Sequence, residues 1–92
     1  MSALPEGRAF ATSRVLCKDL GDEAILLDLE TETYFGLNAA GSRMWNLLTT
    51  SPTVREAYSV MLEEYDVAPE ELERDMSALI ADLVGRGMLR TE

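Results

Sequence analysis

The sequence predicts an α+β fold, with a three-stranded antiparallel sheet followed by three helices. In the first half, short β-favouring runs alternate with turn residues. In the second half, apolar residues recur three and four positions apart, as in helices that bury one face. Strands that all precede the helices are typical of α+β domains. At 92 residues the chain has room for one domain.

A β-hairpin is expected between residues 14 and 29. Residues 14–18 alternate loosely, residues 20–22 offer a turn, and residues 23–29 form a second β-favouring run. One face of this second run holds only aliphatic side chains, whereas the other includes an aspartate. The aliphatic face consists of Ile25, Leu27 and Leu29. We expect this face to be the core side of the sheet.

A third strand is expected at Thr33–Leu37, where aromatic and β-branched residues precede a helix start. As the last strand of a meander it would form a sheet edge, and it has no lysine or proline to discourage pairing. An extended peptide can add to such an edge as a further strand. The alternative, an edge masked by the N-terminal segment, is left open by the sequence.

Capping residues mark the starts of two helices. Asn38 is a favourable N-cap, and the helix that follows carries Met44, Trp45 and Leu48 on one stripe. We expect Trp45 to be a core anchor. The segment from Thr53 to Glu56 fits a capping box, which predicts that a second helix begins there.

A third helix is expected to begin at Pro69, because proline in a first helical turn costs no hydrogen bond. Its apolar stripe is the longest in the chain. Gly85 or Gly87 is expected to end this helix, and the apolar pair after Gly87 is expected to fold back under the core. Residues 1–12 are expected to be a flexible N-terminal arm, and residues 13–92 a single domain.

Composition argues against several classes of function. A formal net charge of -9 without a basic cluster disfavours nucleic-acid binding. The chain has no histidine, which removes the commonest general base and metal ligand. Cys17 is the only cysteine and is expected to be a small core residue. We therefore expect no catalytic residues, no metal and no cofactor.

The longest apolar runs fall far short of the roughly 20 residues needed to cross a bilayer, and the chain start lacks a signal-peptide core. We therefore expect no membrane association. A cytoplasmic location is the default expectation for such a chain with one cysteine.

The segments LLDLETETYFGLNAAGSRMWNLL and TVREAYSVMLEEYDVAPEELERDMSALIADLVGRGML resemble the PqqD-like family, the recognition elements of ribosomally made, modified peptides. The resemblance spans about residues 15–89. Its specific positions are Leu37, Asn38, Gly41, Trp45, Tyr65, Asp75, Gly87, Met88 and Leu89. It implies a small winged helix-turn-helix-like domain that binds the leader segment of a precursor peptide and has no catalytic activity.

In that family the leader lies along the third strand, in a groove formed with the third helix. Carried over, the strand residues are Thr33, Tyr34, Phe35, Gly36 and Leu37. The helix residues, chosen by helical spacing, are Asp75, Ala78, Leu79, Asp82 and Arg86. These ten residues are the peptide-binding site that the resemblance implies.

The chain is more similar to the separate recognition proteins of lasso-peptide pathways than to the pyrroloquinoline quinone chaperone. That likeness implies three partners: a lasso precursor, a transglutaminase-like leader peptidase and an asparagine-synthetase-like cyclase. Two alternatives are a PqqD-type peptide chaperone of pyrroloquinoline quinone biosynthesis and a general protein-protein adaptor subunit. The sequence also leaves an enzyme and a winged-helix DNA binder as weaker readings.

Overall fold

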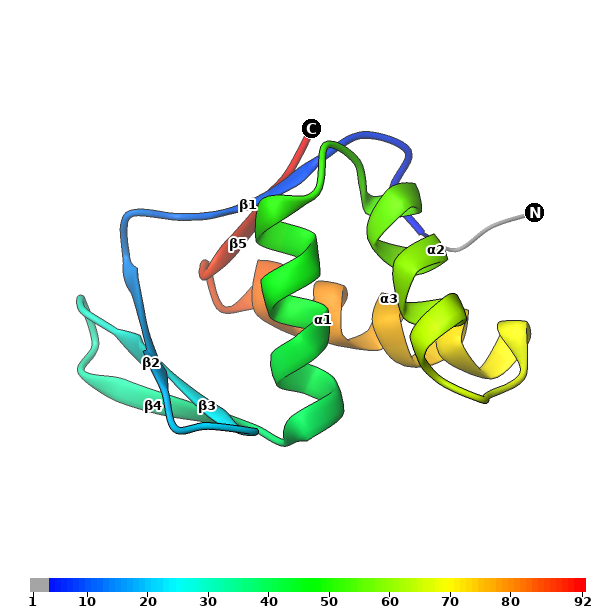
Figure 1. Ribbon diagram of the computed structural model, residues 1–92. Helices are drawn as coiled ribbons and strands as arrows, with labels where there is room; N and C mark the ends of the chain where they lie inside the picture. Colours follow the sequence, from blue (N-terminus) through cyan, green and yellow to red (C-terminus); the bar gives the residue numbers. More distant parts are fainter. Residues whose placement is uncertain (1–3) are drawn as a thin grey trace.

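The computed structural model describes residues 4–92 (Figure 1). The elements in chain order are β1 (Ala9–Ala11), β2 (Val15–Asp19), β3 (Ala24–Asp28), β4 (Thr33–Leu37), α1 (Ala39–Thr50), α2 (Val54–Glu64), α3 (Pro69–Gly85) and β5 (Leu89–Thr91). The strands β2, β3 and β4 form an antiparallel sheet in that order. The predicted α+β fold, a three-stranded sheet followed by three helices, is confirmed.

The sheet and the helices lie side by side, with α1 nearest the sheet in Figure 1. The turn from β4 into α1 is short, because Asn38 alone separates the two elements. The Asn38 side chain accepts a hydrogen bond of 2.8 Å from the Gly41 amide, as an N-cap does. A Cβ on Gly41 would come within 3.3 Å of this Asn38 oxygen. The glycine therefore leaves room for the cap that ends the strand and begins the helix.

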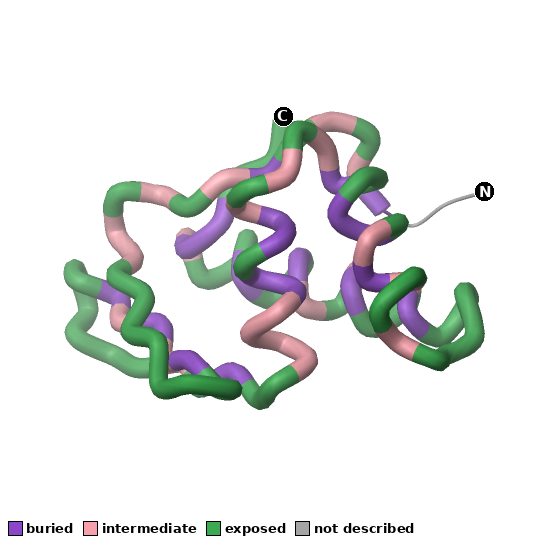
Figure 2. Tube along the Cα trace, viewed as in Figure 1, coloured by how far each residue is buried: buried purple, intermediate pink, exposed green. Residues whose placement is uncertain are grey.

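The core face of the sheet is the opposite of the expected one. Ala24, Leu26 and Asp28 are buried, whereas Leu29 is 52% exposed. Figure 2 shows buried and intermediate positions along this strand. Strand β3 carries apolar residues on both faces, so its own pattern does not choose between them. The register with β4 does: Ala24 and Leu26 lie opposite the apolar Leu37 and Phe35, whereas the competing face meets Gly36 and the more polar Tyr34. More apolar area is therefore buried on the Leu26 side.

An ion pair allows Asp28 to occupy this inner face. The Asp28 carboxylate lies 2.9 Å from the Arg14 guanidinium and accepts backbone hydrogen bonds from Glu30 and Thr31. The Arg14 hydrogen bond, with help from those amides, lowers the pKa of Asp28 to about 2. A buried carboxylate that is paired and hydrogen-bonded avoids most of its desolvation penalty. This pair fastens the segment before β2 to the end of β3.

The predicted helix boundaries are confirmed by their caps. The Thr53 hydroxyl accepts from the Glu56 amide at 3.1 Å, which matches the expected start of α2. After α3, the Gly87 amide donates to the Val84 carbonyl and the Met88 amide donates to the Leu83 carbonyl, both at 3.0 Å. Gly87 has a φ of 77°, which glycine adopts without strain. These features form a Schellman motif, so Gly87 closes the helix as expected.

Buried side chains from all three helices meet in one core. Trp45 is buried as predicted, together with Leu48 on the same helix and Met61 on α2. The Tyr58 hydroxyl donates to the Pro69 carbonyl at 3.0 Å, which joins α2 to the start of α3. Met88 and Leu89 are also buried, so the expected return of the chain under the core is confirmed.

Strands β1 and β5 were not predicted. They pair antiparallel as a separate two-stranded sheet, with Ala9 opposite Thr91. The arm expected over residues 1–12 thus contains a hydrogen-bonded strand, and Leu4 is buried in the core. Residues 1–3 lie outside the described residues. Strands of three residues carry too few side chains for a two-residue period to be visible in the sequence.

The choice of core face can be tested by truncation. We expect Leu26→Ala to lower the free energy of unfolding by about 2 to 5 kcal/mol, because it removes a fully buried side chain. Leu29→Ala removes the same atoms from an exposed position and should leave stability nearly unchanged. Urea unfolding followed by circular dichroism measures both. A larger loss for Leu29→Ala would contradict the observed face.

The Asp28 ion pair predicts a specific pH dependence. The folded pKa of about 2 lies below the ordinary value of 3.8, so the stabilisation is complete above the ordinary value. It should be lost as the pH falls from the ordinary value through about 2. The stability difference between wild type and Asp28→Asn, from urea unfolding, should therefore shrink over that window. Glu30→Gln, at an exposed carboxylate 3.5 Å from Arg14, is the matched control and should show a small difference at every pH.

Candidate functional site

The most distinctive feature of the structure is the free edge of β4. This strand pairs with β3 on one side, and no strand of the described residues pairs with its other side. The N-terminal strand β1 pairs with β5 in the other sheet, so it does not cover this edge. Because backbone groups alternate in direction, about two or three of the five residues of β4 point both N–H and C=O outward. These groups are free to pair with an extended chain.

The side chains of β4 alternate between two environments. Phe35 and Leu37 face the core side, where Leu37 is buried and Phe35 is partly buried against the core. Tyr34 lies on the other face and is 71% exposed. Gly36 has no atom within 4 Å of the position of an added Cβ. The strand therefore presents an open backbone with one large exposed ring beside it.

The C-terminal end of α3 contacts this strand through Arg86. The Arg86 guanidinium lies 4.5 Å from the centre of the Phe35 ring, within the range of a cation–π interaction. The Arg86 Nε atom also donates to Asp82 at 2.9 Å, one helical turn earlier. This contact brings together one strand residue and two helix residues of the expected site.

The other expected helix residues share the stripe but lie farther along α3. Asp75 and Ala78 are exposed, and no hydrogen bond or ion pair in residues 4–92 joins either of them to β4. Leu79 is half-buried and packs against the core, so part of its surface is available to a ligand. The spacing of these residues places them on the same side of the helix as Asp82. We call the side of α3 formed by these residues, Asp75, Ala78, Leu79, Asp82 and Arg86, the helix wall. Its C-terminal end contacts β4 through Arg86.

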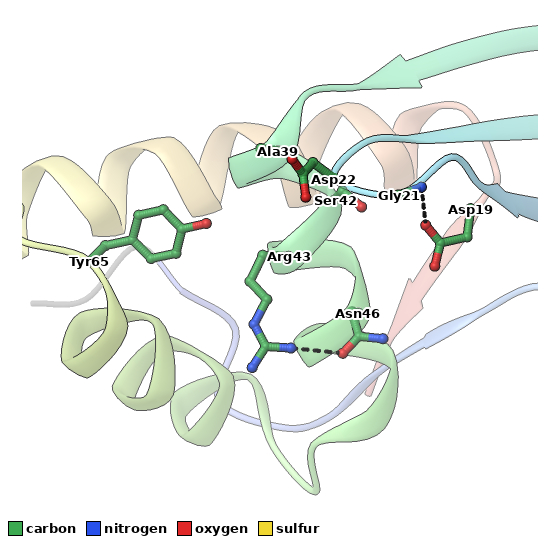
Figure 3. A pocket seen from close by; sticks show the side chains of 8 residues that line it. All are labelled: Asp19, Gly21, Asp22, Ala39, Ser42, Arg43, Asn46 and Tyr65. Atoms are coloured by element: carbon green, nitrogen blue, oxygen red, sulfur yellow. Dashed lines mark hydrogen bonds between the residues drawn. The ribbon is translucent and has the colours of Figure 1, made fainter.

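A second concave feature was not predicted from the sequence. A cavity of about 360 Å³ lies where the β2–β3 turn, the start of α1 and the residue after α2 meet (Figure 3). Its lining residues are Asp19, Gly21, Asp22, Ala39, Ser42, Arg43, Asn46 and Tyr65. They come from distant parts of the chain, so no sequence spacing reveals them.

The charge of this cavity is set by how Arg43 is used. Arg43 donates to Glu64 at 2.9 and 2.6 Å and to Asn46 at 3.2 Å. The side-chain hydrogen bonds between Arg43 and Glu64, with a smaller contribution from their opposite charges, lower the pKa of the Glu64 carboxyl and raise that of the Arg43 guanidinium. Asp19 and Asp22 have no ion-pair partner among residues 4–92, and the Asp19 carboxylate accepts a hydrogen bond from the Gly21 amide. The cavity is polar and acidic, and the Ser42 hydroxyl in its lining has no histidine beside it to act as a general base.

Cys17 is exposed, which corrects the expectation of a buried core residue. It lies on the edge strand β2, opposite the buried Leu26, and an edge strand leaves one side of each residue uncovered. Partial desolvation, followed by the charge of Asp19, raises the pKa of the Cys17 thiol above its ordinary value. A raised pKa disfavours the thiolate, so this residue is not an activated nucleophile.

Two further features concern metals and membranes. In the part of the chain that the structure describes, no group of three or more His, Cys, Asp or Glu side chains is arranged to hold a metal ion. None of the helices formed by residues 4–92 combines the length and the apolar character that crossing a bilayer requires.

Comparisons with known proteins give the family. The family model described as coenzyme PQQ synthesis protein D (PqqD) matches residues 23–89, most of the chain. The chain belongs to the PqqD family. The matched segment includes β3, β4 and all three helices, so the free edge and its helix wall lie within the family domain. The family resemblance noted in the sequence is thereby confirmed.

Two solved structures resemble this PqqD-family protein. One is described as TbiB1 in complex with the TbiA(beta) leader peptide; it is 34% identical, the match covers 88% of this chain and 94% of that one, and the TM-score is 0.81. The other is described as lasso peptide synthetase B1 complexed with the leader peptide. It is 22% identical over 90% of this chain and 98% of that one, with a TM-score of 0.80, and supports the fold. No curated protein matches the chain.

The contact between Arg86 and Phe35 can be measured by a double-mutant cycle. We expect Arg86→Ala and Phe35→Leu to show a coupling of about 0.5 to 1 kcal/mol in the free energy of unfolding, as exposed cation–π pairs do. Arg74→Ala, an exposed arginine on the same helix, should show no coupling to Phe35→Leu. Coupling below the error of the urea titration would contradict the observed stacking.

Proposed function

We propose that this PqqD-family protein binds the leader segment of a ribosomally synthesised precursor peptide. The leader adds to β4 as a fourth strand and lies beside α3. The observation that carries this proposal is the unpaired edge of β4, next to the Arg86 end of the helix wall. The protein acts by binding and has no catalytic role of its own.

The similar solved structures support this proposal. TbiB1, at 34% identity and with nearly the whole of both chains matched, is described in complex with a leader peptide. The second structure is also described as a leader-peptide complex. Both proteins share the fold of this chain, including the part that contains the free strand.

Backbone hydrogen bonds supply only part of the affinity. About four to six bonds can form along β4, each worth about 0.5 to 1.5 kcal/mol net. Ordering a disordered leader costs about 2 to 5 kcal/mol or more, which offsets much of that gain. Side chains of the leader must therefore add affinity by burying apolar surface. The partly buried Phe35 ring on β4 and the half-buried Leu79 on α3 are the apolar groups of the proposed site that can receive them.

The proposed site consists of the residues expected from the resemblance. On β4 they are Thr33, Tyr34, Phe35, Gly36 and Leu37. On and just after α3 they are Asp75, Ala78, Leu79, Asp82 and Arg86. Backbone groups of the first set bind the leader backbone, and side chains of the second set select leader residues.

Binding of the leader delivers the precursor to its modifying enzymes. We assign two such partners, a transglutaminase-like leader peptidase and an asparagine-synthetase-like cyclase, which places the protein in a lasso-peptide pathway in the cytoplasm. A domain that holds only the leader leaves the rest of the precursor accessible to these enzymes.

A second candidate is the peptide chaperone of pyrroloquinoline quinone biosynthesis. The observation in its favour is the description of the matching family model, coenzyme PQQ synthesis protein D. The two candidates share the strand-addition mechanism and differ in the precursor. The genes beside the one that encodes this protein distinguish the two candidates. A short precursor gene accompanied by a cyclase gene would indicate the lasso-peptide pathway.

Strand addition can be tested by titrating the protein with the synthetic leader of the precursor encoded beside its gene. In NMR spectra we expect the largest amide shifts at Thr33–Leu37. Replacing one inward-facing leader amide by an ester removes one donor and should weaken binding by about 1 kcal/mol in isothermal titration. Shifts confined to β2 or α2, or no effect of any single ester along the leader, would exclude β4 as the binding strand.

The helix wall is tested by a charge placed on it. Ala78→Arg adds a bulky cation at an exposed position of the stripe and should weaken leader binding by about tenfold or more. Val84→Arg, at an exposed position on another side of α3, is the matched control and should bind as wild type does. Thermal unfolding of both variants verifies the fold. Equal affinities would remove Ala78 from the site.

A further inference from the structure

The sheet has a second exposed surface that leader binding to the edge does not cover. On the face away from the helices, Leu16, Leu29 and Tyr34 are 54%, 52% and 71% exposed. Leu27 lies between Leu16 and Tyr34, Ile25 lies two residues before it on β3, and both are half-buried. We call these five residues the outer sheet face. Single exposed apolar residues are normal, but a patch of five adjacent ones is typical of an interaction site.

The strand register makes this patch continuous. Leu16 of β2 lies opposite Leu27 of β3, which in turn lies opposite Tyr34 of β4. Directly opposed residues point to the same face with their Cβ atoms about 5 Å apart. The three side chains therefore form a row across the whole sheet. They lie on the face opposite the buried Leu26, which packs in the core with the helices.

Two hollows lie next to this row, one near each end of the strands. The first, about 330 Å³, is lined by Leu27, Asp28, Leu29, Glu32 and Tyr34. The second, about 260 Å³, is lined by Leu20, Glu23, Ala24, Ile25, Gly36, Leu37 and Asn38. Each hollow has the size of one or two side chains, so a protruding residue of a partner can enter it.

Carboxylates border both hollows. Glu32 lines the first and Glu23 the second, and Asp22 in the β2–β3 turn lies next to Glu23. Lys18 is the cation on the strands of this face. With a chain charge of -9, the surroundings of the patch are negative. A second copy of the chain would bring a like-charged rim against this one, which costs free energy.

We propose that the outer sheet face docks a partner protein whose surface has an apolar centre bordered by lysine and arginine. Under the proposed function, on which this inference rests, that partner is the enzyme that acts on the bound precursor. The apolar centre covers the row from Leu16 to Tyr34, and the basic border meets Glu23 and Glu32. The charges contribute mainly to the rate and orientation of docking, and the apolar row to its lifetime.

The position of the patch suits an enzyme that must recognise a loaded carrier. Tyr34 belongs both to the outer sheet face and to the strand that receives the leader. A leader added beside β4 would extend the sheet, and with it the surface on which the partner docks. Leader and enzyme then occupy neighbouring surfaces of one sheet without competing for the same backbone groups.

The experiment measures two affinities separately with the full-length protein. Isothermal titration with the transglutaminase-like peptidase, with and without leader, tests the outer sheet face, and titration with leader alone tests the edge. We expect Leu16→Asp combined with Leu29→Asp to weaken peptidase binding by about tenfold or more. Leader affinity should stay within about twofold of wild type, because neither residue lies on β4.

Charge reversal tests the border. Glu23→Lys combined with Glu32→Lys should slow association with the peptidase and reduce its dependence on salt concentration. Val67→Asp, at an exposed apolar residue between α2 and α3, is the control and should leave both affinities unchanged. Thermal unfolding checks that each variant is folded.

Two results would overturn the inference. One is peptidase binding that is absent in wild type or unchanged in both double variants. The other is a wild-type dimer, in analytical ultracentrifugation, that Leu16→Asp with Leu29→Asp converts to monomers, since the second copy would then be the occupant. If the wild-type protein binds the peptidase but does not bind the leader, the result would instead contradict the proposed function.

Discussion

Every backbone N–H and C=O group needs a hydrogen-bond partner, and β4 satisfies this requirement on one side only. In the unbound protein, water must form hydrogen bonds with the outward N–H and C=O groups of this strand. A guest chain can replace that water without any rearrangement of the domain, because the strand is already held in an extended conformation by β3. The free energy of ordering is then borne by the guest and not by the protein.

The rest of the chain keeps this edge available. The segment most able to cover it is the N-terminal one, and that segment is bound elsewhere. The Thr12 hydroxyl donates to the Gly87 carbonyl at 2.7 Å, and the Thr12 amide donates to the Met88 carbonyl at 3.1 Å. The Glu92 amide donates to the Arg8 carbonyl at 3.0 Å, at the far end of the same pair of strands. The closing turn of α3 and the small β1–β5 sheet thus hold the N-terminal segment away from β4.

The sheet offers three surfaces, because the helices cover one face and leave the other face and the β4 edge open. Its inner face joins the helices to the sheet, its β4 edge is proposed to receive the leader, and its outer sheet face is proposed to receive an enzyme. Acidic residues surround these surfaces and give the chain its charge of -9. A surface of this net charge is electrostatically better matched to neutral or basic partners than to a phosphate backbone. The pKa of the only cysteine thiol is raised by partial desolvation, which disfavours its reactive thiolate.

Local chemistry let the sequence predict much of this architecture. Asn38, Thr53 and Gly87 act within a few residues of themselves, so the ends of the helices could be predicted without knowledge of the fold. The β4 strand and its place at the end of the meander were predicted for the same reason. Family resemblance indicated the helix and helical spacing the choice of Asp82 and Arg86; in the structure Arg86 lies over the Phe35 ring and pairs with Asp82.

Tertiary structure alone decided which face of β3 is buried, because that strand has apolar residues on both sides and only the register with β4 distinguishes them. It also decided the β1–β5 pairing and the acidic cavity around Arg43, which join residues far apart in the chain. The physical reason is the same in each case: local preferences extend over a few residues, whereas burial and charge pairing depend on which segments meet in space.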